Sequence, residues 1–188
     1  YACSTYPAFD RQFMDSVRQE TIDNVRRLRH HACLALWCGN NELEMHVVEK
    51  AKGSEGMTFA DYEKLFDILI PEVLAAEAPD IPYWRSSPHT PVDDWRDYNN
   101  DDSGDSHLWD VWFQGKPFTW YRERPTRFCS EFGFQSWPHP DTIRTFATEE
   151  DYNCTSRVMD FHQRNRMGNQ RVLSYLMDYF RLPVGFEN

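Results

Sequence analysis

Two glutamates of the sequence, Glu42 and Glu131, stand in settings where a carboxylate could do chemistry. Glu42 follows Asn40 and Asn41, whose neutral amides can hydrogen-bond hydroxyl groups without adding charge. Glu131 precedes the aromatic run Phe132–Phe134, and aromatic faces can stack on sugar rings. Cleavage of a glycosidic bond uses two carboxyl groups: one donates a proton to the leaving oxygen, and the other attacks the anomeric carbon or activates water. The pair therefore indicates a paired-carboxylate hydrolase, with two solvated loop residues as the alternative.

Short apolar runs that read as strands must position these glutamates. The run Leu34–Cys38 ends just before the polar cluster Gly39–Glu42, and the run Arg127–Gly133 contains the second glutamate. Another short strand is expected over Ile81–Ser86, and His107–Trp112 could be a further strand end.

Helices are predicted between and around these strands. Apolar residues spaced by three or four predict an amphipathic helix over Ala8–Arg29. A second helix, Phe59–Ala78, is expected to kink or break at Pro71, because proline has no backbone N–H to donate. Three more helical stretches follow the last strand: Asp141–Phe146, Ser156–Arg164 and Gln170–Phe180.

The alternation of helices and strands indicates an α/β protein with parallel strands joined by crossover helices. Polar or aromatic clusters follow three strands, at Gly39–Glu42, Trp84–Ser87 and Glu131–Ser136. In a (β/α)8 TIM barrel the active site is built from the C-terminal ends of the strands and the loops after them. A complete barrel needs about 200–250 residues or more. About four strands in 188 residues therefore predict either a half-sized open sheet or part of a barrel, and the missing initial Met favours the second.

Several motifs resemble β-mannosidases of glycoside hydrolase family 2. Leu36–Glu42 (LWCGNNE) and Ser130–Ser136 (SEFGFQS) are similar to the two catalytic signatures of that family. Four other segments resemble the family in the same order: YACSTYPAF near the start, YWRSSPH at Tyr83–His89, GDSHLWDVW at Gly104–Trp112 and FHQRNRMGNQRVLSYL at Phe161–Leu176. The resemblance covers essentially the whole chain. Phe113-Gln114 departs from it, because the family tends to have His-Gly there.

The resemblance implies a retaining exo-β-mannosidase, which releases terminal non-reducing β-D-mannose residues by double displacement through a covalent glycosyl-enzyme. By match to the motifs, Glu42 would be the general acid/base and Glu131 the nucleophile. Asn41 would bind the hydroxyl at C2 of the sugar. Three further residues would line the substrate pocket: Trp84, His107 and Trp109.

The same resemblance implies an architecture and a set of partners. Residues 1–188 would be part of the catalytic (β/α)8 domain, from about strand 3 to helix 7, without the flanking β-sandwich domains. Such an incomplete barrel is expected to be inactive alone and to need the remaining domains of the parent chain. The expected ligand is a β-mannoside, with no metal and no cofactor. Two alternatives remain: another family 2 β-glycosidase, such as a β-galactosidase or β-glucuronidase, and a non-catalytic sugar-binding barrel fragment.

Composition argues against other classes of function. The net charge is −10 and the basic residues form no long block, so binding to nucleic acid or an anionic membrane is not expected. No apolar run approaches the roughly 18–20 residues of a membrane span. Five cysteines, none in a CxxC pair, are expected to be buried reduced thiols and favour the cytoplasm, with a lysosomal or secreted location as the alternative. The acidic run Asp93–Asp105 is expected to be a solvated loop.

Overall fold

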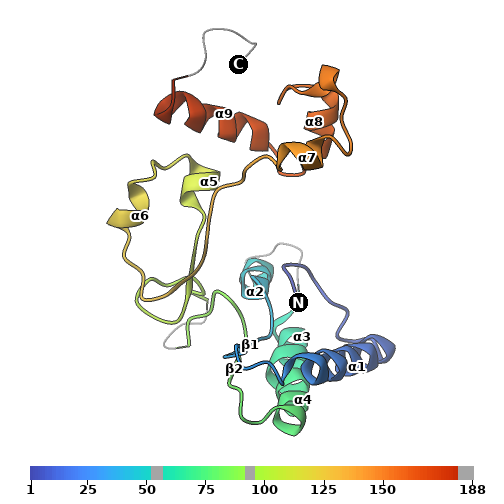
Figure 1. Ribbon diagram of the computed structural model, residues 1–188. Coiled ribbons are helices and arrows are strands. Elements are labelled where there is room, and N and C mark those ends of the chain that lie inside the picture. The colour runs from blue at the N-terminus through green and yellow to red at the C-terminus, as the bar shows by residue number, and fades with distance from the viewer. Residues whose placement is uncertain (52–56, 92–95, 182–188) are drawn as a thin grey trace. The chain divides into compact units, whose positions relative to one another are not determined.

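The computed structural model describes residues 1–51, 57–91 and 96–181, and it divides into two compact units (Figure 1). The first unit consists of Tyr1–His107 and Pro125–Glu131. The second consists of Leu108–Arg124 and the chain from Phe132 onward. Helices alternate with short strands along the chain, which confirms the predicted α/β class.

The first unit has a core of helices around one long amphipathic helix. Helix α1 (Arg11–Leu28) packs against α4 (Ile70–Glu77) and buries Val17 and Val25, two residues of the predicted apolar face (Figure 1). Asp10 caps its start by accepting a hydrogen bond of 2.9 Å from the N–H of Phe13. The helix is therefore present, with ends slightly inside the predicted range.

The second predicted helix changes its pitch before proline. It consists of α3 (Phe59–Glu63), the π-helix η1 (Lys64–Leu69) and α4. Pro71 lies just after η1, at whose end the N–H of Ile70 donates to the carbonyl of Leu65. The next carbonyl in this pattern, that of Phe66, cannot be bonded by proline and accepts from the Tyr83 hydroxyl at 2.8 Å instead. The π-turns just before Pro71 carry the buried residues Leu65, Phe66 and Leu69. The expected interruption thus takes the form of a wider helical segment rather than a gap.

Two short parallel strands lead toward the predicted site. Strand β1 (Trp37–Cys38) pairs with β2 (Tyr83–Trp84), and the parallel bridge between Asn41 and Ser87 extends this contact. Both strands are shorter than predicted. Gly39 is required at the end of β1, since a Cβ there would collide with the Tyr83 hydroxyl and lie 2.6 Å from the carbonyl oxygen of Arg85.

A second strand pair carries the other predicted site residues. β3 (Ser106–Leu108) and β4 (Cys129–Phe132) form a two-stranded sheet, and the N–H of Ser106 donates to the carbonyl of Phe128 at 2.8 Å. The pairing brings His107 and Glu131 of the first unit to neighbouring strands. Helix α2 (Leu43–Ala51), which the sequence did not predict, begins directly after Glu42.

Two expectations about polar residues are wrong. Asp105 is only 5% exposed, so the acidic run is not solvated along its whole length; its residues 93–95 lie outside the described part of the chain. All five cysteines are free, but Cys3, Cys33 and Cys38 are exposed and only Cys129 and Cys154 are half-buried. These small side chains sit in segments that cover little of the core, which sequence hydropathy does not reveal.

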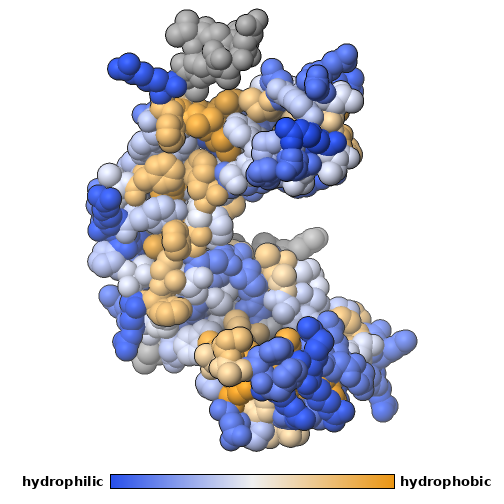
Figure 2. All heavy atoms as spheres, viewed as in Figure 1, coloured by the Kyte–Doolittle hydropathy of each residue, from blue (hydrophilic) through white to orange (hydrophobic). Residues whose placement is uncertain are grey.

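The second unit is mainly helical. It contains α5 (Asp110–Gln114), α6 (Trp120–Glu123), α7 (Pro140–Ile143), the 3-10 helix η2 (Glu149–Asp151), α8 (Arg157–His162) and α9 (Gly168–Tyr179). An aromatic cluster holds α9 to the loops before it: Phe118, Phe134, Tyr175 and Tyr179. Apolar side chains also reach the surface (Figure 2); near the end of α9 these are Met177 and Phe180. None of the described helices is both long and apolar enough to cross a bilayer.

Candidate active site

Glu42 occupies a strained turn between the end of the β1 segment and the start of α2. Its backbone is in the left-handed region, with a φ of 61°, which is uncommon for a residue other than glycine. Its N–H donates to the carbonyl of Ser87 at 2.8 Å. The turn therefore fixes the direction in which the Glu42 carboxylate leaves the backbone.

Asn40 holds this turn through all of its side-chain polar atoms. Its Oδ1 accepts hydrogen bonds from the N–H of Leu43 at 3.1 Å and from the Ser86 hydroxyl at 2.7 Å. Its Nδ2 donates to the carbonyl of Arg85 at 2.8 Å and to the Tyr62 hydroxyl at 3.3 Å. Asn40 is buried, so its loss would leave several of these groups unsatisfied.

Three titratable side chains of the first unit meet at one place. His107 Nδ1 lies 2.9 Å from Glu42 Oε1 and 3.2 Å from Glu131 Oε2. One atom from each side chain can be chosen so that all three lie within 4.8 Å of one another. The histidine is buried, whereas the carboxylate side chains keep 23% and 35% of their surface exposed. The two glutamates therefore face a common, partly open space.

His107 is held from its backbone and from the far side of its ring. Asn99 accepts from the His107 N–H at 2.8 Å and donates to its carbonyl at 3.0 Å, as a neighbouring strand would. The second ring nitrogen, Nε2, lies 2.9 Å from the Ser87 hydroxyl oxygen. These contacts fix both the position and the rotation of the imidazole.

Asp105 lies on the Nε2 side of His107, beyond Ser87, and accepts four hydrogen bonds. Its Oδ2 accepts from the hydroxyls of Ser87 and Ser130, both at 2.6 Å. Its Oδ1 accepts from Trp84 Nε1 and from the N–H of His89, both at 2.9 Å. Burial alone would raise the pKa of Asp105, but these four donors together hold the pKa below its ordinary value.

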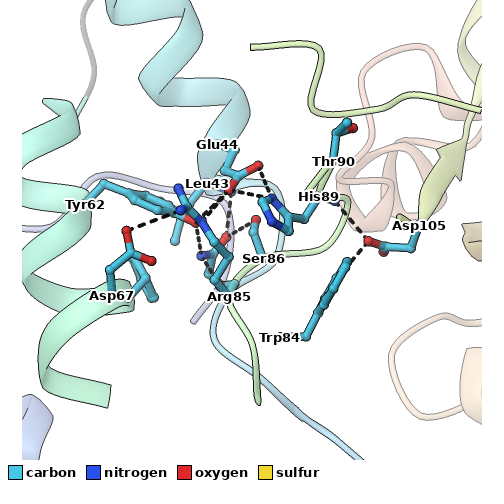
Figure 3. A network of polar contacts seen from close by, with 12 residues as sticks. Leu43, Glu44, Tyr62, Asp67, Trp84, Arg85, Ser86, His89, Thr90 and Asp105 are labelled. Atoms are coloured by element: carbon cyan, nitrogen blue, oxygen red, sulfur yellow. Dashed lines mark hydrogen bonds and ion pairs between the residues drawn. The ribbon is translucent and has the colours of Figure 1, made fainter. Parts of the chain in front are cut away.

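A second buried network anchors the start of α2 (Figure 3). Glu44, which is 1% exposed, accepts from Arg85 Nε at 2.9 Å and from the Tyr62 hydroxyl at 3.1 Å, and contacts His89 Nδ1 at 3.0 Å. Arg85 also pairs with Asp67 at 3.3 Å, while burial raises the pKa of the Asp67 carboxyl. Arg85 Nη2 is buried and has no hydrogen-bond partner among the described residues. The network fixes the helix that begins one residue after Glu42.

The chain is similar in sequence to proteins named β-mannosidases. No protein-family model matches the chain. The protein named β-mannosidase B from Neosartorya fischeri is 32% identical over 199 residues, covering 100% of this chain and 23% of the relative. The β-mannosidase of Capra hircus is 32% identical over 193 residues, covering 97% of this chain and 22% of the relative.

A solved structure agrees with these relatives. The crystal structure of β-D-mannosidase from Dictyoglomus thermophilum matches 98% of this chain with a TM-score of 0.82 and 34% identity. This chain is β-mannosidase-like. The resemblance found in the sequence motifs is thereby confirmed over the full chain. The β-mannosidase-like chain spans 22% to 23% of the length of these three proteins.

The structure brings together some of the predicted site residues of the β-mannosidase-like chain. Glu42, Glu131 and His107 meet directly. Asn41 precedes Glu42, and its N–H donates to the carbonyl of Tyr1 at 2.7 Å. Trp84 lies in the same unit, with its indole N–H bound to Asp105. Trp109 belongs to the second unit, where its ring contacts that of Phe113 at 6.0 Å between centroids.

Several polar residues around the site were not predicted. They hold the three central side chains or the start of α2: Glu44, Arg85, Ser87, His89, Asp105 and Ser130. Asn40 was expected to face hydroxyl groups of a ligand, but it is buried and its amide holds the turn at Glu42. The position of the unpredicted residues in the sequence could have identified them, since each lies within three residues of a predicted strand end or site residue. Their chemistry depends on partners more than 15 residues away, which spacing alone does not reveal.

The same three central side chains could also serve a cation. Among the described residues, Glu42, His107 and Glu131 offer three ligand atoms within 4.8 Å. A ring nitrogen that donates a hydrogen bond has no lone pair for a metal, so the two uses of His107 Nδ1 exclude each other. The contacts of 2.9 and 3.2 Å from Nδ1 to the two carboxylates are hydrogen-bond distances.

Proposed function

We propose that the chain carries both catalytic carboxylates of a retaining exo-β-mannosidase acting on terminal non-reducing β-D-mannose residues. The observation that carries the proposal is the convergence of Glu42 and Glu131 on one histidine nitrogen, at 2.9 and 3.2 Å. The two glutamates are 89 positions apart in the sequence, so their meeting is a property of the fold. The similarity to three β-mannosidases supports the choice of substrate.

The spacing of the carboxylates supports retention of configuration. Retaining glycosidases hold the two carboxyl groups about 5–5.5 Å apart, whereas inverting enzymes leave about 6.5–9.5 Å for a water molecule. Oxygen atoms of Glu42 and Glu131 lie within 4.8 Å of each other. This upper bound for the nearest oxygens supports the shorter of the two spacings, that of a retaining pair.

The proposed reaction has two displacements. Glu131 attacks the anomeric carbon while Glu42 gives a proton to the departing oxygen, and a covalent mannosyl-enzyme forms. Glu42 then takes a proton from water, whose oxygen attacks the same carbon and releases Glu131. Both carboxylates are partly open, so sugar and water can reach them.

The other predicted site residues complete the proposal. Asn41 binds the hydroxyl at C2, and the rings of Trp84 and His107 line the sugar pocket in the first unit. Residues 1–188 form the part of a (β/α)8 catalytic domain from about strand 3 to helix 7, and the parent chain supplies the remaining strands and the β-sandwich domains. The parallel pairing of β1 with β2 supports this architecture. For the location we propose the cytoplasm, on the basis of the five free cysteines.

Replacement of the nucleophile tests the proposal. In the complete polypeptide, Glu131→Gln should reduce hydrolysis of a nitrophenyl β-mannoside to background, because an amide cannot form the glycosyl ester. Glu150→Gln is the matched control, since Glu150 is an exposed residue of η2 and should keep full turnover. Steady-state hydrolysis by Glu131→Gln, free of wild-type enzyme, would remove Glu131 from this role.

Replacement of the acid/base and a choice of substrates test the rest. Glu42→Ala should slow substrates with poor leaving groups most, and azide should restore part of the rate by attacking the glycosyl-enzyme without a base. A panel of nitrophenyl glycosides should show preference for the β-mannoside. Faster hydrolysis of the β-galactoside or β-glucuronide would assign a different specificity, and no hydrolysis of any glycoside would favour a sugar-binding protein.

A further inference from the structure

The protons around Asp105 can be counted from its four contacts, those to Trp84 and His89 being drawn in Figure 3. An ionised carboxylate only accepts hydrogen bonds, and each of the four groups at Asp105 can donate. The two contacts at 2.6 Å match the length of hydroxyl–carboxylate bonds with a charged acceptor. Ser87 Oγ also lies 3.2 Å from Ser130 Oγ, and Ser130 Oγ lies 3.4 Å from the carbonyl oxygen of Ser106. Both contacts are much longer than the 2.6 Å contacts to the charged carboxylate, so the hydroxyl hydrogens of Ser87 and Ser130 both point at Asp105.

This arrangement decides what Ser87 can offer to His107. A serine hydroxyl has one hydrogen, and that of Ser87 is bound to Asp105. Only lone pairs of the Ser87 oxygen remain for His107 Nε2, which lies 2.9 Å away. His107 must therefore carry a hydrogen on Nε2 and donate it to Ser87.

The other ring nitrogen must carry a hydrogen as well. Nδ1 faces an oxygen of Glu42 at 2.9 Å and an oxygen of Glu131 at 3.2 Å. If Nδ1 were a bare lone pair, one protonated glutamate could donate to it, but the other carboxylate oxygen would face the same lone pair with no hydrogen between them. A hydrogen on Nδ1 satisfies both contacts at once as a shared donor.

We propose that Asp105 is a positioning residue that acts through Ser87 to keep His107 doubly protonated, so that the imidazolium bridges Glu42 and Glu131. The charges then alternate across the site: Asp105 negative, His107 positive, and two carboxylates in front of it. The bridge offsets the repulsion between the two glutamates, which would otherwise oppose their close approach. The protonation state follows from hydrogen bonding alone, and its catalytic consequence rests on the function proposed above.

The proton on Nδ1 has a place in that reaction. It moves over 2.9 Å to Glu42 Oε1, and from Glu42 to the departing oxygen as Glu131 bonds to the anomeric carbon and the glycosidic bond breaks. His107 is then neutral, with its hydrogen on Nε2. When water attacks and frees Glu131, the water's proton passes to Glu42 and back to Nδ1. The site ends each cycle with the proton where it began.

Asp105→Asn separates this proposal from a simple structural role. The asparagine can keep its oxygen toward Trp84 and His89 and place its amide toward Ser87 and Ser130. Ser87 is then free to donate to His107 Nε2, and His107 becomes neutral with a hydrogen only on Nδ1. The variant loses one negative and one positive charge, so the net charge of the site is unchanged and the fold should tolerate it.

Neutron diffraction on the deuterated, complete protein near neutral pH tests the assignment without using activity. The wild type should show deuterium on both Nδ1 and Nε2 of His107, and Asp105→Asn should show it on Nδ1 only. Asp102→Asn is the matched control: an exposed aspartate of the same loop, whose replacement should leave both positions occupied. A wild-type ring with one bare nitrogen overturns the proposal, whether or not any variant folds.

Kinetics then test the catalytic part. Asp105→Asn should lower kcat/KM for a nitrophenyl β-mannoside by about tenfold, less than the roughly 10²–10⁴-fold contribution of a complete general acid. The high-pH limb of its rate profile should move to lower pH, because the site holds one proton fewer. Unchanged kinetics with the expected deuterium positions would remove the catalytic role of Asp105. Turnover by Glu131→Gln would instead refute the proposed function and leave the protonation of His107 standing.

Discussion

Arg85→Met should destabilise the protein strongly, because it leaves the carboxylate of Glu44 buried without its cationic partner. Glu44 is 1% exposed, and Arg85 Nε lies 2.9 Å from its Oε1 (Figure 3). Methionine retains most of the apolar stem of arginine, so the substitution removes mainly the charge and its hydrogen bonds.

The magnitude follows from burial and from the remaining partners. Two charges about 4 Å apart attract by about 4 kcal/mol at an effective dielectric constant of 20. Removal of one partner of a buried pair costs about 3–5 kcal/mol. Tyr62 and His89 still contact Glu44 in the variant, so the loss should fall near the lower limit, at about 3 kcal/mol. The free energy of unfolding of a typical protein is about 5–15 kcal/mol, so a loss of this size should be easy to measure.

Urea unfolding followed by tryptophan fluorescence measures this loss. A loss of about 3 kcal/mol should lower the urea midpoint by about 1–3 M for ordinary slopes. Arg18→Met is the matched control, because Arg18 and Glu72 also pair at 2.9 Å but keep 46% and 56% of their side-chain surface exposed. An exposed pair contributes about 0–1 kcal/mol. The double variant Glu44→Gln with Arg85→Met should lose less than Arg85→Met alone. Equal losses for Arg85→Met and Arg18→Met would refute the reasoning.

Two further predictions concern the turn at Glu42 and the buried aspartate. Asn40→Ala should lower the free energy of unfolding by about 1–3 kcal/mol, because the buried groups that Asn40 binds lose their partner. The same substitution should lower kcat by displacing Glu42. An unchanged urea midpoint would show instead that water replaces the amide. The pKa of Asp105 is held below its ordinary value, so its contribution to stability is complete above about pH 3.8 and is lost as the pH falls through the lower folded pKa. The stability cost of Asp105→Asn, measured by urea unfolding in a His107→Gln background so that the imidazole does not titrate, should therefore shrink from about pH 6 to about pH 3, and a constant cost would contradict the assignment.

Local patterns in the sequence predicted the elements whose formation is local. A series of residues spaced by three or four, with Val17 and Val25 among them, predicted α1, and Pro71 predicted the irregularity before α4. Helix α2 was missed, because a nine-residue segment of mixed polarity has little periodicity to distinguish it from a loop. Its formation depends on Asn40 at its start and on the buried Glu44, both held by residues around position 85.

The site was predictable to the extent that its residues form motifs. Glu42 and Glu131 stood out by their neighbours, and His107 by the family resemblance. Asp105 gave no such signal, because it resembles the solvated aspartates beside it in the sequence. Its burial follows from contacts with Trp84, Ser87 and Ser130, each at least 18 residues away, and only the folded chain brings these donors together.

The left-handed backbone of Glu42 sets folding and catalysis against each other at one position. A residue with a Cβ loses about 1–2 kcal/mol in this conformation, a penalty that glycine escapes. A library of random variants passed through a heat challenge alone should accumulate Glu42→Gly, which removes the Cβ, and Glu42→Asn, whose short polar side chain tolerates this backbone conformation. The same library screened for sugar release should retain glutamate at position 42. A difference between the two selections would therefore identify position 42 as functional from this protein alone.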